Sequence, residues 1–223
     1  MTGGGGNDVF DGGAGNDLLY RGAGNDALTG GAGNDTLAEL AGADRIGGGA
    51  GIDTVLYNDG TAGVTVNLAT GTGSGGSAQG DVLSGIENLT GRTGNDVLIG
   101  NDILVGAGGT DTLTGGAGAD RFVYGSIGRS PVGAGADRVT DFSHAQGDRI
   151  DLSAIDANIS ATGDQAFRFI GTGLYSHHAG EPRFAETAPG VVTIAGDVNG
   201  DGVSDFHITL SGHLTLVAPD FVL

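Results

Sequence analysis

The chain has 223 residues, including 48 Gly, only 4 Pro and no Cys, and its formal net charge at pH 7 is −18. With so little Pro the chain is not collagen-like, and without Cys it forms neither a disulfide nor a Cys-ligated metal site. The excess of carboxylates argues against nucleic acid and anionic membranes as partners and favours divalent cations. No apolar run reaches the roughly 18 residues of a membrane-spanning helix, so membrane insertion is not expected.

The segment 1–56 repeats with a period of nine residues, which is sought before single elements are assigned. From Gly3 the repeats read GGGGNDVFD, GGAGNDLLY, RGAGNDALT, GGAGNDTLA, ELAGADRIG and GGAGIDTVL. The sixth position is always Asp, namely Asp8, Asp17, Asp26, Asp35, Asp44 and Asp53. The eighth is always apolar, namely Phe10, Leu19, Leu28, Leu37, Ile46 and Val55.

A second block of repeats covers 91–123. It reads GRTGNDVLI, a shortened GNDILV (100–105), GAGGTDTLT and GGAGADRFV. Its candidate metal-binding residues are Gly94, Asp96, Asp111 and Asp120. The shortened repeat lacks three residues, which leaves the strand register and the ligands open at that point.

Each position of the repeat has a physical role. Glycines at positions one, two and four permit positive φ and a close approach of neighbouring backbones. Asn at position five tolerates the left-handed region better than most residues. The last three positions alternate out, in and out, as a short strand does. We therefore predict a six-residue turn and a three-residue strand per repeat, with two repeats forming one coil and coils stacking about 4.8 Å apart.

Stacking such coils places one Asp carboxylate above another along each edge. Two charges about 5 Å apart repel by about 0.8 kcal/mol in water and about 3 kcal/mol at an effective dielectric of 20. One buried apolar side chain per repeat contributes roughly 1.5–3 kcal/mol, against an ordering cost of about 1–2 kcal/mol per residue. Burial alone does not fold this sequence. A hard divalent cation between the loops reverses the electrostatic effect, and oxygen-only ligands favour Ca²⁺. The alternative is that these Asp residues only cap turns.

The pattern GGxGxDxUx, with U apolar, resembles the RTX (repeats-in-toxin, hemolysin-type calcium-binding) family. The resemblance implies an all-β fold, a right-handed parallel β-roll solenoid of nonapeptide repeats. It also implies that Ca²⁺ ions bind between a loop and the loop two repeats later. The first loop would supply the carbonyls of its second and fourth residues and its Asp. The second loop would supply the carbonyls of its first and third residues and its Asp.

Four sites follow from this resemblance. The first uses Gly4, Gly6, Asp8, Arg21, Ala23 and Asp26. The second uses Gly13, Gly15, Asp17, Gly30, Ala32 and Asp35. The third uses Gly31, Gly33, Asp35, Gly48, Ala50 and Asp53. The fourth departs from the pattern, because Glu39 and Leu40 replace Gly, and it uses Gly22, Gly24, Asp26, Glu39, Ala41 and Asp44.

The spacer 57–90 breaks the period. Val64, Val66 and Leu68 alternate as in a strand, and the stretch GTGSGGSAQG is typical of a flexible loop. The spacer is similar to those found between RTX blocks. We expect it either to continue the coil or to bulge from it.

In 124–223 Gly becomes rarer and short strand-like runs appear, which predicts an antiparallel β cap on the open end of the roll. This region resembles the C-terminal domain of serralysin-type secreted proteins. The matching segments are DRVTDF (137–142), GDRIDLSAI (147–155), FRFIGT (167–172), AGEPRF (179–184) and GDVNGDGVSDFHITL (196–210).

One loop in this region has the oxygen-rich spacing of an EF-hand start. Asp197, Asn199, Asp201 and Asp205 occupy places one, three, five and nine, and the Val203 carbonyl occupies place seven. Place twelve is Ile208 rather than Glu, and the flanking segments are predicted strands. The pattern indicates a calcium loop in a β-hairpin, with a plain Asx-rich turn as the alternative.

The chain ends in Asp220, Phe221, Val222 and Leu223, an acid followed by three apolar residues. In the resembled family such an end belongs to an uncleaved signal for type I secretion. A final strand is the alternative.

No catalytic pattern appears: neither HExxH nor G-x-S-x-G is found, and adjacent His177 and His178 would point apart in a strand. We predict a non-catalytic, extracellular calcium-binding module that folds on Ca²⁺ outside the cell. Its expected partners are several Ca²⁺ ions, the type I secretion machinery through the C-terminus, and the upstream domain of a larger exported bacterial protein. The alternatives are a carbohydrate-binding or adhesin module, the C-terminal part of a secreted hydrolase contributing to substrate binding, and an enzyme with its active site in 124–223.

Overall fold

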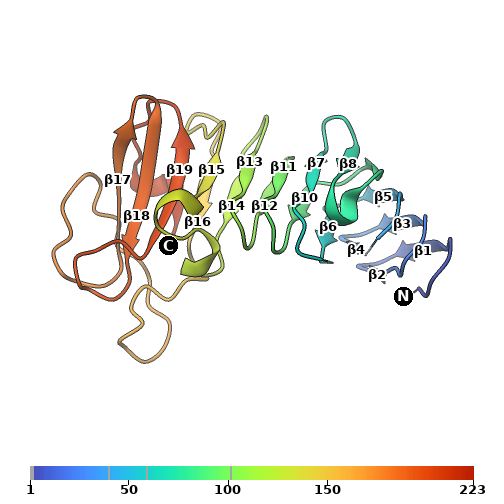
Figure 1. The fold of residues 1–223 in the computed structure, drawn as a ribbon, viewed down its shortest axis with the longest axis horizontal. Helices are drawn as coiled ribbons and strands as arrows, with labels where there is room; N and C mark the ends of the chain where they lie inside the picture. Colours follow the sequence, from blue (N-terminus) through green and yellow to red (C-terminus); the bar gives the residue numbers. More distant parts are fainter. Residues whose placement is uncertain (1–2, 40, 59, 101) are drawn as a thin grey trace.

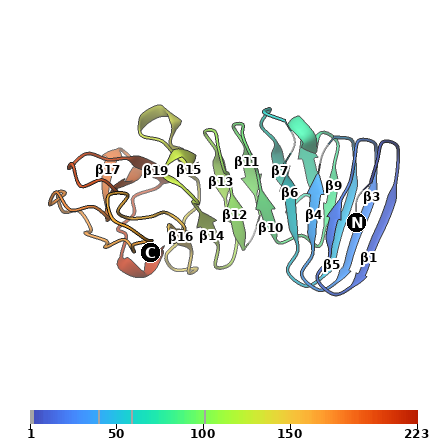
Figure 2. The ribbon, with the colours of Figure 1, turned by 90° about the horizontal axis from the view of Figure 1, so that it is seen from below.

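The computed structural model describes residues 3–39, 41–58, 60–100 and 102–223, which form strands, short 3₁₀ turns and loops. Two sheets lie face to face along an elongated roll, with the N-terminal coil at one end and the longer strands β17, β18 and β19 at the other (Figures 1 and 2). Across the described ranges, no helix is long and apolar enough to cross a membrane.

The described strands belong to two sheets. The first runs in the order β1 (Val9–Ala14), β3 (Ala27–Ala32), β5 (Arg45–Ala50), β9 (Val82–Ser84), β8 (Thr72–Ser74), β7 (Thr65–Asn67), β11 (Val97–Ile99), β13 (Thr112–Thr114), β15 (Asp137–Val139), β19 (Phe206–Ser211), β18 (Val191–Asp197) and β17 (Glu181–Ala188). The second runs in the order β2 (Leu18–Tyr20), β4 (Thr36–Glu39), β6 (Thr54–Tyr57), β10 (Asn88–Thr90), β12 (Ile103–Val105), β14 (Arg121–Val123), β16 (Arg149–Asp151) and β20 (Phe221–Val222). The 3₁₀ turns are η1 (Gly76–Ala78), η2 (Ile127–Arg129), η3 (Gly133–Gly135) and η4 (Ala218–Asp220).

The predicted coil of two repeats is confirmed by the strand register. Leu28 of β3 pairs with Ile46 of β5, and Leu19 of β2 pairs with Leu37 of β4, in parallel. The fold is therefore a parallel β-roll. Strands β1, β3 and β5 are six residues long rather than the three expected, because they run on into the Gly-Gly-Ala start of the next repeat. Gly13 pairs with Gly31 there, so the glycine-rich segment takes part in the ladder.

The core of the roll is a single file of apolar side chains from position eight. Leu19, Leu28, Leu37, Ile46 and Val55 are at most 2% exposed. The same file continues through Leu89, Leu98, Leu104, Leu113 and Phe122, each completely buried. The inward-facing positions predicted from the period are thus confirmed, and the core is only one side chain wide in each sheet.

The spacer 57–90 both continues the coil and bulges from it. In the second sheet β10 lies in parallel between β6 and β12, with Leu89 paired to Val55 on one side and Leu104 on the other. In the first sheet β7 and β8 form an antiparallel hairpin, and β8 pairs antiparallel with β9. The second sheet therefore carries the roll across the spacer.

The shortened repeat keeps its strand and loses residues from its turn. Leu104 of β12 pairs with Leu89 and with Phe122, and it is completely buried. The register of β12 is therefore the one that places Leu104 in the core, in line with Leu89 and Phe122. Asn101 lies outside the described residues.

The roll continues beyond the expected end of the second block at residue 123. Val139 of β15 pairs in parallel with Leu113, and Ile150 of β16 pairs in parallel with Phe122. Neither sheet breaks between 123 and 124. The antiparallel cap comes later: β19 joins β15 in parallel, and β18 and β17 then follow in antiparallel order.

Candidate metal centres

Acidic residues form two rows along the edges of the roll, each residue directly before a strand or at its start. The first row contains Asp8, Asp26, Asp44 and Asp81 and is extended by Asp96, Asp111 and Asp137. The second row contains Asp17, Asp35, Asp53 and Glu87 and is extended by Asp102, Asp120 and Asp148. Because the strands are parallel and in register, the same position of each repeat meets the same edge.

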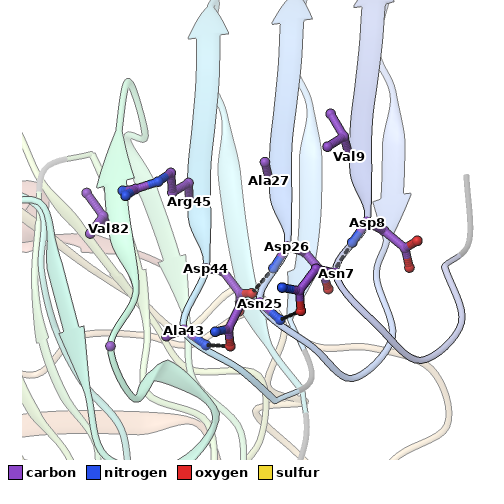
Figure 3. Close-up of a pocket in the computed structure, with 11 residues that line it drawn as sticks. Asn7, Asp8, Val9, Asn25, Asp26, Ala27, Ala43, Asp44, Arg45 and Val82 are labelled. Carbon is purple, nitrogen blue, oxygen red and sulfur yellow. Dashed lines mark hydrogen bonds between the residues drawn. The ribbon is translucent and has the colours of Figure 1, made fainter.

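In most members of the rows, one carboxylate oxygen accepts a hydrogen bond from the backbone of the preceding coil. The Asp8 N–H donates to Asp26 Oδ1 over 2.8 Å, and the Asp26 N–H donates to Asp44 Oδ1 over 2.7 Å (Figure 3). In the second row the Asp35 N–H donates to Asp53 Oδ1 over 2.8 Å. The carboxylates therefore do act as caps, but they cap the neighbouring coil rather than their own turn.

In several of these residues one carboxylate oxygen is buried and has no hydrogen-bond partner. This holds for Oδ2 of Asp17, Asp35, Asp53, Asp81, Asp111, Asp120 and Asp137. Buried polar atoms are nearly always paired, and leaving a charged one unpaired costs more than a neutral one. A capping role for the Asp residues does not explain why these oxygens are buried without a partner, whereas a bound cation would give each of them one.

The position-one glycines show what surrounds these oxygens. A Cβ on Gly12 would come closer than 3.0 Å to both Asp17 Oδ2 and the Gly30 carbonyl oxygen. A Cβ on Gly30 would come equally close to Asp35 Oδ2 and the Gly48 carbonyl oxygen. These oxygen pairs belong to the second and third predicted sites, so two of the donors assigned to each site lie close together, and an all-oxygen set fits Ca²⁺.

The remaining carbonyls of these sites also lie at the junction between coils. A Cβ on Gly31 or on Gly33 would come closer than 3.0 Å to the carbonyl oxygen of Gly13 or Gly15, respectively. The Ala32 carbonyl accepts a hydrogen bond from the Gly15 N–H over 2.7 Å and keeps a second lone pair. The third site repeats the arrangement, with the Ala50 carbonyl accepting from the Gly33 N–H over 2.8 Å.

The first predicted site is assembled in the same way at the N-terminal coil. A Cβ on Gly22 or Gly24 would come closer than 3.0 Å to the Gly4 or Gly6 carbonyl oxygen. The Ala23 carbonyl accepts from the Gly6 N–H over 2.8 Å. Asp8 is half-buried, because only one coil lies next to it. The Gly4, Gly6 and Ala23 carbonyls of this site therefore lie at the junction between the first two coils.

The fourth predicted site does not fit a metal. The guanidinium of Arg21 lies among the donors that the sequence assigned to Ca²⁺, namely Gly22, Gly24, Asp26, Ala41 and Asp44. Its Nη2 lies 2.5 Å from Asp44 Oδ2. The side chain of Glu39, the sixth residue assigned to this site, lies outside the described part of the chain. A positive side chain therefore lies among the oxygens that were predicted to bind the metal.

In the second block the four candidates differ from one another. A Cβ on Gly109 would come closer than 3.0 Å to the Gly94 carbonyl oxygen, so this carbonyl lies at the junction with the next coil. Asp96 has partners for both oxygens, with Val64 N–H at 2.8 Å and Arg92 N–H at 3.3 Å. Asp111 and Asp120 each keep an unpartnered Oδ2. Metal binding here stays a prediction that Asp111 and Asp120 support best.

Asn at position five has a different role from the one expected. Asn7, Asn16, Asn25, Asn34 and Asn95 all have negative φ, and positive φ occurs at position-four glycines such as Gly24 and Gly33. The Asn side chains instead form a ladder along the coils: the Asn25 N–H donates to Asn7 Oδ1 over 2.9 Å, and the Ala43 N–H donates to Asn25 Oδ1 over 3.0 Å (Figure 3).

The sequence does not mark five members of the rows as candidates: Asp81, Glu87, Asp102, Asp137 and Asp148. Each is followed two residues later by a buried apolar side chain, as in Asp148 and Ile150. The segment GAGADRV (133–139) even keeps the full spacing of the repeat. An acidic residue followed two residues later by an apolar one therefore predicts a member of the rows even where the glycines of the repeat are missing.

Burial changes the acidity of the later carboxylates. It raises the pKa of Asp137 to about 8, of Asp81 to about 7 and of Asp111 to about 6. Backbone N–H donors oppose this rise in pKa, and the neighbouring carboxylate of the row adds to it. Without a cation, these carboxyl groups therefore keep a proton to higher pH than an ordinary Asp does.

The loop after β18 lies in the β-hairpin that the sequence predicts. Asp197 Oδ1 accepts from the Gly200 N–H over 2.6 Å, and Asp197 Oδ2 accepts from the Gly202 N–H over 2.9 Å. Asn199 Nδ2 donates to Asp205 Oδ1 over 3.0 Å. Asp201 Oδ1 accepts from the Val203 N–H over 2.8 Å. These contacts form an Asx-rich turn whose oxygens still have free lone pairs, so calcium binding at this loop stays a prediction.

No group of three His, Asp or Glu side chains that could hold a metal ion occurs within the described ranges. A metal bound by the roll would therefore take most of its ligands from backbone carbonyls, with two carboxylates per site. This is the donor set of the first three predicted sites.

The last residues form the strand β20. It pairs in parallel with β16, through Ile150 and Phe221 and through Asp151 and Val222. Phe221 is only 5% exposed and its ring centroid lies 4.7 Å from that of Phe169. The end of the chain is thus an integral part of the second sheet.

Comparisons with known proteins agree with this geometry. A family model described as the peptidase M10 serralysin C-terminal region matches residues 48–223. A model described as the RTX calcium-binding nonapeptide repeat (4 copies) matches residues 2–37 and 20–55. No curated protein matches the chain.

Two solved structures are similar to the chain. The AlgE6R3 subunit of the mannuronan C5-epimerase from Azotobacter vinelandii is 20% identical, with a TM-score of 0.35, over 98% of this chain and 78% of that chain. The AlgE6R2 subunit of the same enzyme is 21% identical, with a TM-score of 0.36, over 84% of this chain and 90% of that chain.

We expect Gly30→Ala to remove one bound Ca²⁺ ion. The added Cβ would collide with Asp35 Oδ2 and the Gly48 carbonyl oxygen, which are both donors of the third site. Gly5→Ala is the matched control, since its Cβ would meet no atom within 4 Å. Isothermal titration calorimetry of both variants checks this expectation. Equal stoichiometry in the two variants would contradict the placement of the third site.

We expect acid to act in opposite directions with and without Ca²⁺. In Ca²⁺-free buffer, the raised pKa values of Asp111, Asp81 and Asp137 mean that the folded chain holds more protons than the unfolded chain. Their stabilising contribution is present below the unfolded pKa of 3.8 and is lost as pH rises through about 6, 7 and 8. Circular dichroism should show more strand at about pH 5.5 than at about pH 8. In saturating Ca²⁺ the order should reverse, because protons then compete with the ion.

Proposed function

This chain belongs to the peptidase M10 serralysin C-terminal family and carries RTX calcium-binding nonapeptide repeats, and on this premise we propose that it folds on Ca²⁺ outside the cell and supports the type I secretion and the stability of a larger exported bacterial protein. Calcium-binding repeats of this kind mark a calcium-binding module of a secreted protein. The proposal adds when the module folds and how its C-terminus is used.

The observation that carries the proposal is the set of buried, unpartnered Asp oxygens. Those of Asp17, Asp35 and Asp53 lie close to a carbonyl oxygen of the next coil, as Asp35 Oδ2 does to the Gly48 carbonyl. The ion would supply the positive charge that these oxygens lack. The chain supplies the rest: the Asp side chains, the carbonyls and the glycines that let them approach. Folding and metal binding would then be one event, because the site exists only when the coils stack.

The location follows from the affinity such sites have. Extracellular calcium modules bind with dissociation constants of about 10⁻⁴–10⁻³ M, far above the free Ca²⁺ of a cytosol. Inside the cell the net charge of −18 keeps the chain extended, which suits passage through a narrow channel. Outside, Ca²⁺ would join the coils, and several coupled sites would make the transition steep.

The buried C-terminus supports this order of events. Asp220 and Phe221 are 2% and 5% exposed in the folded chain, and β20 is paired along β16. A secretion signal at this end is accessible to another protein only before the chain folds. If the chain is exported unfolded and folds on Ca²⁺ afterwards, the same segment can serve first as the secretion signal and then as strand β20.

A Ca²⁺ titration followed by circular dichroism tests the coupling. The chain should gain strand signal with Ca²⁺ and lose it with EDTA. Asp35→Asn should shift the midpoint to higher Ca²⁺ by about tenfold or more, since weakening two sites that share one carboxylate costs upwards of about 1.4 kcal/mol. Asp11→Asn removes the same charge from an exposed position and should leave the midpoint in place. A strand spectrum that EDTA does not change would overturn the proposal.

Secretion is tested by removing residues 220–223 from the chain in cells that carry a type I apparatus. The truncated chain should stay inside the cells. Ile194→Ala is the control, because it removes a fully buried side chain of β18 without touching the end of the chain. It should lower stability and still be exported. Normal export of the truncated chain would rule out a signal in these residues.

A further inference from the structure

Arg21 differs from every neighbouring residue at the first position of the repeat. That position is Gly3, Gly12, Gly30 and Gly48 in the other described repeats of the first block that keep the pattern. At Gly12, Gly30 and Gly48 a Cβ would point at the Asp Oδ2 of its own loop. A side chain at position one is therefore directed into the junction between coils, where the sequence places the cation.

The Arg21 side chain takes this direction and meets the donors of the fourth predicted site. Its Nη1 lies 3.3 Å from the Gly22 carbonyl oxygen and 3.2 Å from that of Ala41, which belongs to the next coil. Longer contacts of 3.5 Å join Nη1 to the Gly24 carbonyl and to Asp26 Oδ2. Nη2 reaches Asp44 Oδ2 at 2.5 Å. One guanidinium thus bridges two coils through three carbonyls and two carboxylates.

The side chains of this cluster are shielded from solvent. Arg21, Asp26 and Asp44 are 2%, 3% and 1% exposed. A guanidinium keeps its charge in such a place, since its pKa is above 12, and its fork of N–H donors suits carboxylates and carbonyls together. A Ca²⁺ ion needs the same oxygens at about 2.3–2.6 Å. The ion and the guanidinium cannot both hold these oxygens.

We propose that Arg21 is a built-in cation that replaces Ca²⁺ between Asp26 and Asp44, so that this junction of the roll closes without metal. The inference rests on the proposed function in one respect. It assigns the positive charge at this junction to an Arg side chain, whereas the proposed function assigns the positive charge at the other junctions to Ca²⁺ from solution. The coils of Asp26 and Asp44 are then joined at any Ca²⁺ concentration, and the first row binds one ion fewer than its donor sets suggest. A permanently closed junction gives the Ca²⁺-dependent coils a place from which to propagate.

Counting bound ions tests this assignment. Arg21→Gly restores the residue that other repeats carry and should bind one Ca²⁺ more than the parent, measured by native mass spectrometry at saturating Ca²⁺. Arg45→Gly is the matched control: it also removes one positive charge and adds one glycine, at an exposed position of β5 in the next coil (Figure 3). It should bind the parent's number. An unchanged count in Arg21→Gly, with Ca²⁺ bound by the parent, would overturn the proposal. Absence of Ca²⁺ from all three chains would instead refute the proposed function.

A second measurement does not depend on how the variant folds. In the Ca²⁺-saturated parent, nuclear magnetic resonance should show the Arg21 guanidinium protons exchanging with water at least tenfold more slowly than those of Arg45. Exchange at the same rate for both side chains would mean that Arg21 does not occupy the junction, and would reject the inference.

Discussion

The structure depends on one constraint: a carboxylate oxygen buried between stacked coils needs a positive partner. The period of nine places an Asp at the same edge of every coil, and the parallel register stacks these residues in rows. One oxygen binds the backbone of the preceding coil, and the other is left inside. With a core one side chain wide, the roll has little apolar burial to offset unpaired charge, so the partner of that oxygen decides whether the coils hold together.

The chain meets this constraint in several ways. At Asp17 and Asp35 the oxygen lies beside carbonyls of the next coil, in a donor set that suits Ca²⁺. Between Asp26 and Asp44 an Arg side chain supplies the charge. Asp96 and Asp148 turn the second oxygen to backbone N–H groups. Asp137, with its pKa raised to about 8, favours a proton when no cation is bound. A single repeat pattern therefore contains junctions with different demands for metal.

The roll and the cap form one continuous structure. β15 and β16 carry the two sheets past the last recognisable glycine-rich repeat, β19 joins in parallel, and the antiparallel hairpin of β18 and β17 closes the first sheet. β20 closes the second sheet with the end of the chain itself. The segment proposed as the export signal is thus also the last strand of the roll. In this proposal it acts as a signal in the unfolded chain and stabilises the second sheet in the folded chain.

The sequence by itself determined the repeat, the coil of two repeats, the inward file from Leu19 to Val55, the Asp rows of the first block and the hairpin around Asp197. These are set by local spacing: a side chain two residues after an Asp turns inward because a strand alternates. Only the tertiary structure showed the Asn ladder, the six-residue strands, the split of the spacer and the extension of the rows to Asp137 and Asp148. It also showed the Arg21 guanidinium among the oxygens of the fourth predicted site, because the direction of a side chain at position one matters only once another coil lies against it.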